Sequence, residues 1–189
     1  LPLDGSWLME GMATFIERQL RHFAGLYSAD QVWTEWLGGM PTGALGLNRD
    51  GLRRGNPYWS GAVALLSAAK AIVEQSGGNR SIADCLRGGL AMVGNATQRG
   101  RTDEVIQACD QSTGTLVLAD FYRRHVGPAE FNLPQLWQHL GMSRCNGSIV
   151  YDGSTAMANL RRSILSPPRG FKAPSLAPNV ARSLGISMR

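Results

Sequence analysis

The chain has 189 residues, of which 43% are apolar and 17% charged, as expected for one ordinary globular domain with a hydrophobic core. This composition excludes disorder along the whole chain, and no apolar run approaches the length of a membrane span, so no membrane partner is expected. Four of the five net positive charges lie in residues 166–189, which contain no acidic residue. The rest of the chain therefore lacks the basic surface of a nucleic-acid-binding protein, and no nucleic acid partner is expected.

The first half of the chain predicts two helices, a loop and a buried helix. Residues 6–25 carry apolar side chains at intervals of three and four, which is typical of an amphipathic helix. Residues 28–37 open with a serine cap and predict a short helix, and the glycine-rich residues 38–57 predict an ordered loop. Residues 58–76 are apolar on nearly all sides, which predicts a central core helix.

The second half predicts further short helices and very little sheet. Ser81 and Asp84 resemble a capping box, which starts a helix that runs to about Met92. One short extended piece is expected at residues 146–153, and a basic tail with four prolines at 166–189, either extended on the surface or disordered. The remaining helical patterns cover residues 102–111, 116–125, 133–140 and 155–165.

The three cysteines are odd in number, widely spaced and form no C-x-x-C pair. This pattern indicates neither a disulfide framework nor a structural zinc site, so Cys85, Cys109 and Cys145 are expected to be buried thiols. The opening string LPLDGSWLMEG has neither an initiator methionine nor a signal peptide, which is typical of a cut inside a longer protein. The sequence therefore assigns no compartment.

Glu10 lies on the first predicted helix, away from its apolar stripe, where a glutamate is normally a solvated surface residue. Its neighbourhood suggests another role. The string SWLMEGMATF (6–15) is similar to the W-L-x-E-G-x-A segment of the gluzincin aminopeptidases, in which the glutamate is the third zinc ligand. The resemblance implies that Glu10 is a metal ligand, beside two histidines of an HExxH motif on another helix.

Tyr58 begins the predicted core helix, where an aromatic residue commonly packs on its neighbours. The string NPYWSGAVALL (56–66) resembles the P-Y-x-K-G-x-x-L-L helix start of the same enzymes, in which the tyrosine stabilises the tetrahedral intermediate. Ser60 replaces the lysine of that pattern. The resemblance implies a catalytic role for Tyr58 in hydrogen bonding to an oxyanion.

Two further segments, 76–89 and 112–142, resemble parts of the glycyl aminopeptidases, so the resemblance spans about residues 6–165. It implies an all-α, irregular multi-helix domain like the C-terminal helical lobe of thermolysin-like aminopeptidases. The expected domains are a helical lobe at 1–165 and the basic, proline-rich tail at 166–189. A full-length parent is expected to bind zinc and to act on peptide substrates.

The chain contains no HExxH, because no two of its histidines stand four residues apart. His22, His125 and His139 are therefore expected to be ordinary surface or partly buried residues. This chain alone should bind no zinc and catalyse nothing, and self-association through exposed apolar surface is expected without the missing part. The alternatives are a non-catalytic helical scaffold, a peptide-binding module of the same fold and, more weakly, a tail that binds an anionic partner.

Overall fold

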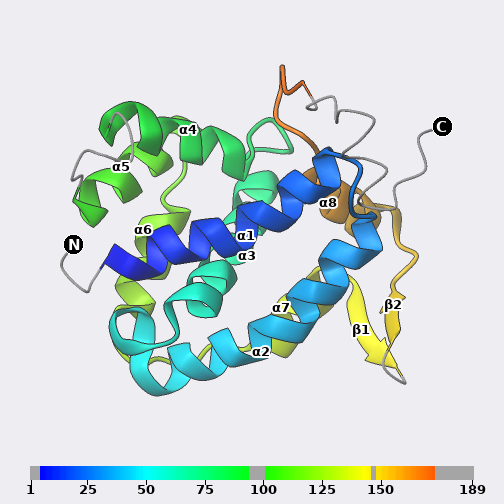
Figure 1. Ribbon diagram of the computed structural model, residues 1–189, viewed down its shortest axis with the longest axis horizontal. Helices are drawn as coiled ribbons and strands as arrows, with labels where there is room; N and C mark the ends of the chain where they lie inside the picture. The colour runs from blue at the N-terminus through cyan, green and yellow to red at the C-terminus, as the bar shows by residue number, and fades with distance from the viewer. Residues whose placement is uncertain (1–4, 94–100, 146–147, 173–189) are drawn as a thin grey trace, which may run out of the picture.

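The computed structural model describes residues 5–93, 101–145 and 148–172 (Figure 1). These residues form eight helices and one two-stranded sheet, which confirms the predicted all-α, multi-helix class. The elements in chain order are α1 (Ser6–Phe23), α2 (Ala29–Arg54), α3 (Pro57–Gln75), α4 (Ile82–Val93), α5 (Thr102–Thr113), α6 (Val117–His125), α7 (Leu133–His139), β1 (Met142–Cys145), β2 (Ser148–Tyr151) and α8 (Thr155–Ile164).

Helix α3 is the centre of the fold, as its apolar sequence predicts. It packs against α1, α2, α4, α6 and α8, and α1 crosses it at the front in Figure 1. Its side chains from Ala62 to Leu66 are fully buried. The helix begins sharply because Pro57 occupies its first turn and the Asn56 side chain accepts hydrogen bonds from two backbone N–H groups.

Helix α2 corrects the prediction of a loop at residues 38–57. The helix that opens at Ala29 continues through Pro41 and, after a kink at Gly51 (φ 72°), ends at Arg54. Two of its glycines face α3: a Cβ atom at Gly39 would overlap the Trp59 ring, and one at Gly43 would overlap the Trp59 carbonyl group. These glycines allow two helices to approach closely, a role that the sequence pattern does not separate from that of turn glycines.

Strands β1 and β2 and helix α8 form a small C-terminal unit, which the hydrogen bonds of Arg161 hold together. Strands β1 and β2 pair in antiparallel fashion, with Met142 opposite Tyr151. The extended piece predicted at 146–153 corresponds to β2, while the paired strand β1 was not predicted. Arg161 of α8 is buried and donates hydrogen bonds to the carbonyl groups of Leu140, Gly141 and Asp152, which fixes the hairpin against α8.

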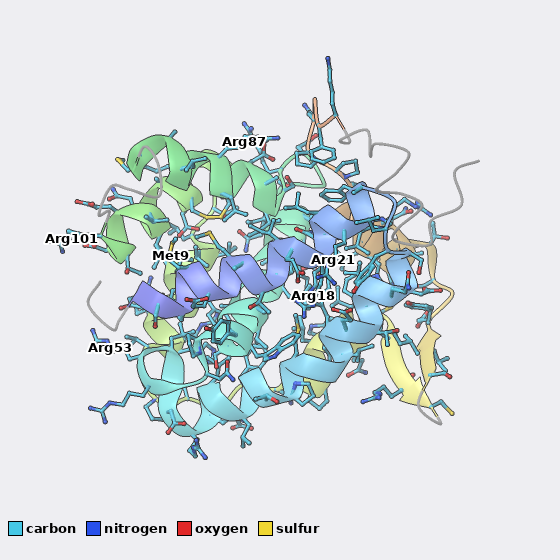
Figure 2. The ribbon with its side chains drawn as sticks, viewed as in Figure 1. Met9, Arg18, Arg21, Arg53, Arg87 and Arg101 are labelled. Carbon is cyan, nitrogen blue, oxygen red and sulfur yellow. A yellow bond between two sulfur atoms is a disulfide. The ribbon has the colours of Figure 1, made fainter. Side chains whose placement is uncertain are left out.

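A disulfide between Cys85 and Cys109 corrects the prediction of three buried thiols (Figure 2). The two residues are 24 apart in sequence and join α4 to α5, which pack side by side. Their spacing gives no signal because only the pairing of the two helices brings them together. Cys145 is the one free cysteine and is exposed, so its predicted burial was also wrong.

The start of the predicted tail packs on the domain. The Phe171 ring lies 5.4 Å from that of Phe23 at the end of α1. The prediction for the rest of the tail, residues 173–189, lies outside the described residues. None of the helices described here is both long enough and apolar enough to cross a membrane.

Candidate functional site

The two segments that carry Glu10 and Tyr58 meet where α1 crosses α3. A Cβ atom added to Gly61 would overlap the Trp7 carbonyl oxygen and crowd Gly11, and one added to Gly11 would overlap the backbone of Gly61. Gly11 directly follows Glu10, and Gly61 lies three residues after Tyr58. The structure therefore brings the two sequence motifs together through the glycines that both contain.

Tyr58 is held at a defined position while its side chain remains accessible. The Asn56 Oδ1 atom accepts a hydrogen bond from the Tyr58 backbone N–H at 3.0 Å. The neighbouring Trp59 ring packs on Gly39 of α2 and lies 4.9 Å below the Arg18 guanidinium of α1. Tyr58 is thus held by the Asn56 cap and by its neighbour Trp59, whose ring contacts α1 and α2, whereas Tyr58 itself is 51% exposed.

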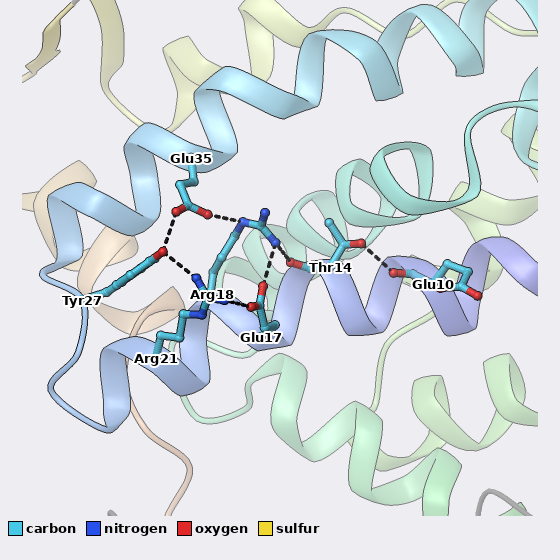
Figure 3. Close-up of polar contacts among 7 residues, drawn as sticks. All are labelled: Glu10, Thr14, Glu17, Arg18, Arg21, Tyr27 and Glu35. Carbon is cyan, nitrogen blue, oxygen red and sulfur yellow. Dashed lines mark hydrogen bonds and ion pairs between the residues drawn. The ribbon is translucent and has the colours of Figure 1, made fainter. Parts of the chain in front are cut away.

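Glu10 is half-buried rather than fully solvated. Its carbonyl oxygen accepts a hydrogen bond of 2.8 Å from the Thr14 hydroxyl, and Figure 3 shows both residues in one row with Arg18 along α1. Within residues 5–93, 101–145 and 148–172, no hydrogen bond or ion pair engages the Glu10 carboxylate. That carboxylate is therefore available for a ligand outside the described structure.

A cluster of charged residues at the far end of this row was not predicted (Figure 3). Arg18 Nε forms an ion pair with Glu35 Oε2 at 2.8 Å, without a well-aligned hydrogen bond, and so joins α1 to α2. The Tyr27 hydroxyl donates to Glu35 Oε1 at 2.7 Å. On α1 itself, Glu17 pairs with Arg21 one turn away. Only this last pair has a signal in the sequence, because Arg18 and Glu35 lie on different helices and Tyr27 lies in the segment between them.

The histidines supply no metal site with Glu10. His22 Nδ1 lies 2.9 Å from the Tyr27 carbonyl oxygen, and His139 is exposed at the end of α7. His125 is only 5% exposed, which corrects its prediction as a surface or partly buried residue. Among the described residues, no three His, Cys, Asp or Glu side chains gather so that they could hold a metal ion. By themselves, these residues do not fit zinc.

The surface also contains a largely apolar cavity of about 910 Å³ between α2, α7 and the hairpin. Leu45 and Val150, both among the exposed large apolar side chains, line it together with Trp137. Its size is within the range of ligand pockets. The cavity lies along the middle of α2, and neither Glu10 nor Tyr58 lines it.

Comparison with known protein families, with curated proteins and with solved structures finds no match for this chain.

Proposed function

We propose that this chain is the helical lobe of a zinc-dependent, aminopeptidase-like peptidase. In this proposal Glu10 is one metal ligand, Tyr58 stabilises an oxyanion, and the substrate is a peptide. The described residues alone do not fit zinc, so the two imidazole ligands must come from an HExxH helix outside this sequence. Zinc held in this way would polarise a carbonyl group. The chain alone is inactive in this account.

The observation that carries the proposal is the contact between Gly11 and Gly61. In the two gluzincin aminopeptidase motifs that the chain resembles, the glutamate directly precedes the glycine that matches Gly11. The tyrosine lies three residues before the glycine that matches Gly61. The glycine contact fixes the two helix backbones against each other, so the attachment points of Glu10 and Tyr58 are fixed as well. Such preorganisation is what a catalytic site requires.

The lack of a partner for the Glu10 carboxylate and the exposure of Tyr58 are compatible with these roles. The Glu10 carboxylate accepts no bond from another described residue, so a ligand would not have to displace a partner. The Tyr58 side chain is half exposed, so its hydroxyl can donate a hydrogen bond to a bound substrate. A hydrogen bond that forms only as negative charge develops on the substrate oxygen lowers the activation barrier.

We expect Tyr58→Phe to lower kcat about 100-fold in the polypeptide that contains both this chain and the HExxH helix. KM should change much less, because the hydroxyl acts mainly in the transition state. Steady-state kinetics on an amino-terminal peptide substrate would measure both constants. Tyr122→Phe is the matched control, since Tyr122 lies on α6 and packs its ring against that of Trp7. An equal loss in kcat for both variants, or a change in KM alone, argues against the oxyanion role.

The second candidate is a non-catalytic scaffold or peptide-binding module with the same fold. The apolar cavity beside the hairpin favours it, because apolar pockets suit peptide side chains. This candidate requires that the complete polypeptide binds no zinc and that Glu10→Gln leaves its stability nearly unchanged. Calorimetric titration of that polypeptide with zinc separates the two candidates.

A further inference from the structure

The apolar cavity of about 910 Å³ between α2, α7 and the hairpin lies apart from Glu10 and Tyr58. We call it the hairpin cavity. Leu37, Pro41 and Leu45 line it from one stripe of α2, because they follow one another at intervals of four residues. Leu45 is 61% exposed, so this apolar wall is open to a ligand.

Arg144 brings a positive charge to the lining of the hairpin cavity. It lies two residues after Met142 on β1, and Met142 pairs with Tyr151 of β2, so the three side chains share one face of the hairpin. The Tyr151 hydroxyl donates to Asp30 Oδ1 at the start of α2, at 2.8 Å. This face of the hairpin is therefore directed toward α2, and the Arg144 side chain lies on the side of the cavity.

The charge of Arg144 is unmatched. Within the described part of the chain, no hydrogen bond or ion pair engages its guanidinium group. Asp152 also lines the cavity, but its Oδ1 accepts a hydrogen bond from the Ser154 N–H at 2.6 Å. The Asp152 N–H donates to the Gly141 carbonyl group, so Asp152 lies beside Gly141, three residues or about 10 Å along β1 from Arg144. A cation beside an apolar wall suits a ligand with a carboxylate and an apolar group.

Gln138 of α7 adds a neutral polar group to the same lining. In residues 5–93, 101–145 and 148–172, no hydrogen bond engages its side-chain amide. An amide both donates and accepts, so it can pair with the C=O and the N–H of one peptide unit. A fatty acid would use Arg144 and the apolar wall, but it has no peptide unit to offer to Gln138. A peptide therefore matches the lining better than a fatty acid does.

We propose that the hairpin cavity binds the carboxyl-terminal end of a peptide whose last residue is apolar. The terminal carboxylate pairs with Arg144, the last side chain packs on Leu45 and Trp137, and the last peptide unit bonds to Gln138. The volume is within the usual range for ligand sites. This inference deepens the second candidate above, the peptide-binding module, and rests on it, but it does not require the zinc site.

Calorimetric titration of the whole chain with acetyl-leucyl-leucine and with its carboxyl-terminal amide tests the proposal. The acid should bind, and the amide, which has the same side chains but no negative charge, should bind at least about fivefold more weakly. Acetyl-glycyl-glycine, which has the charge but no apolar side chain, should also bind more weakly than the acid. So should octanoate, which has no peptide unit.

Each contrary result has a separate meaning. Equal affinity for the acid and the amide would overturn the recognition of the carboxyl terminus but would leave the peptide-binding module standing. Octanoate binding as tight as that of the acid would overturn the choice of a peptide as the ligand. If neither leucyl peptide bound at millimolar concentration, this proposal and the use of the cavity by a peptide-binding module would both fail.

Two variants with exposed side chains locate the binding. Arg144→Gln should weaken binding of the acid about fivefold and remove its advantage over the amide. Arg162→Gln is the matched control, because Arg162 is exposed, bonds to Asn159 and does not line the cavity. Leu45→Gln should weaken binding of the acid and the amide alike, about threefold. Its control is Leu116→Gln, since Leu116 is 66% exposed and lies outside the cavity.

Methionine methyl resonances locate the ligand in the unmodified protein. Met142 lines the cavity, whereas Met9 lies on α1 and does not. The Met142 methyl resonance should shift on titration with the acid, and that of Met9 should not. An unshifted Met142 resonance, or unchanged affinity in folded Arg144→Gln, contradicts the proposal.

Discussion

Replacing Gly61 by alanine is expected to lower the free energy of unfolding by about 3 kcal/mol. The new Cβ atom would overlap the Trp7 carbonyl oxygen and crowd Gly11, and backbone atoms of two packed helices cannot rotate away as a side chain can. The helices α1 and α3 would have to separate or slide. Urea denaturation followed by circular dichroism measures the loss.

Gly38→Ala is the matched control for this prediction. Gly38 also lies inside a helix, but an added Cβ atom would meet nothing within 4 Å. Alanine has the higher helix propensity, so this variant should be about 0.5–1 kcal/mol more stable than the unchanged protein. If Gly61→Ala were as stable as Gly38→Ala, the close crossing of α1 and α3 would be wrong. Glu10 and Tyr58 would then not be held at fixed positions relative to each other.

Reduction of the Cys85–Cys109 disulfide should lower the free energy of unfolding by about 3 kcal/mol, because the bond closes a loop of 24 residues in the unfolded chain. Both cysteines are buried, so the reductant should act slowly until the α4–α5 pair opens. Denaturation with and without dithiothreitol measures the difference.

The double variant Cys85→Ala, Cys109→Ala should lose about as much stability as reduction does, and the reductant should then have no further effect on it. Cys145→Ser is the control, since Cys145 is exposed and outside the bond. It should be as stable as the unchanged protein, both with and without dithiothreitol. If dithiothreitol did not change the free energy of unfolding of the unchanged protein, a structural role for this disulfide would be contradicted.

The helices with a strong apolar period could be predicted closely. The predicted spans 6–25 and 58–76 agree with α1 and α3 to within two residues at each end, because burial of an apolar face decides both helices. The start of α2 was predicted at residues 28–37, but its continuation to Arg54 could not be predicted. By local propensity, Gly39 and Gly43 are helix breakers. In the folded protein they lie inside a helix, where the absence of a side chain leaves room for Trp59. That contact depends on a partner helix that lies outside any local window of sequence.

The residues of the candidate site could likewise be predicted only in part. Glu10 and Tyr58 were singled out by a resemblance of short motifs, and periodicity alone would have left both as ordinary helical residues. The pairing of Arg18 with Glu35, the disulfide and the buried His125 all depend on contacts between separate helices. None of them leaves a spacing pattern that a single sequence reveals.

The central claim is that Glu10 completes a metal site, and zinc affinity tests it most directly. The polypeptide that contains this chain and the HExxH helix should bind one zinc ion. Glu10→Gln should weaken that binding at least about tenfold while leaving the helical circular dichroism unchanged. Glu74→Gln, on the exposed end of α3 and paired with Lys70, is the control and should bind zinc normally. Equal zinc affinity in the Glu10→Gln variant and the unchanged polypeptide, or no zinc in either, would contradict the account.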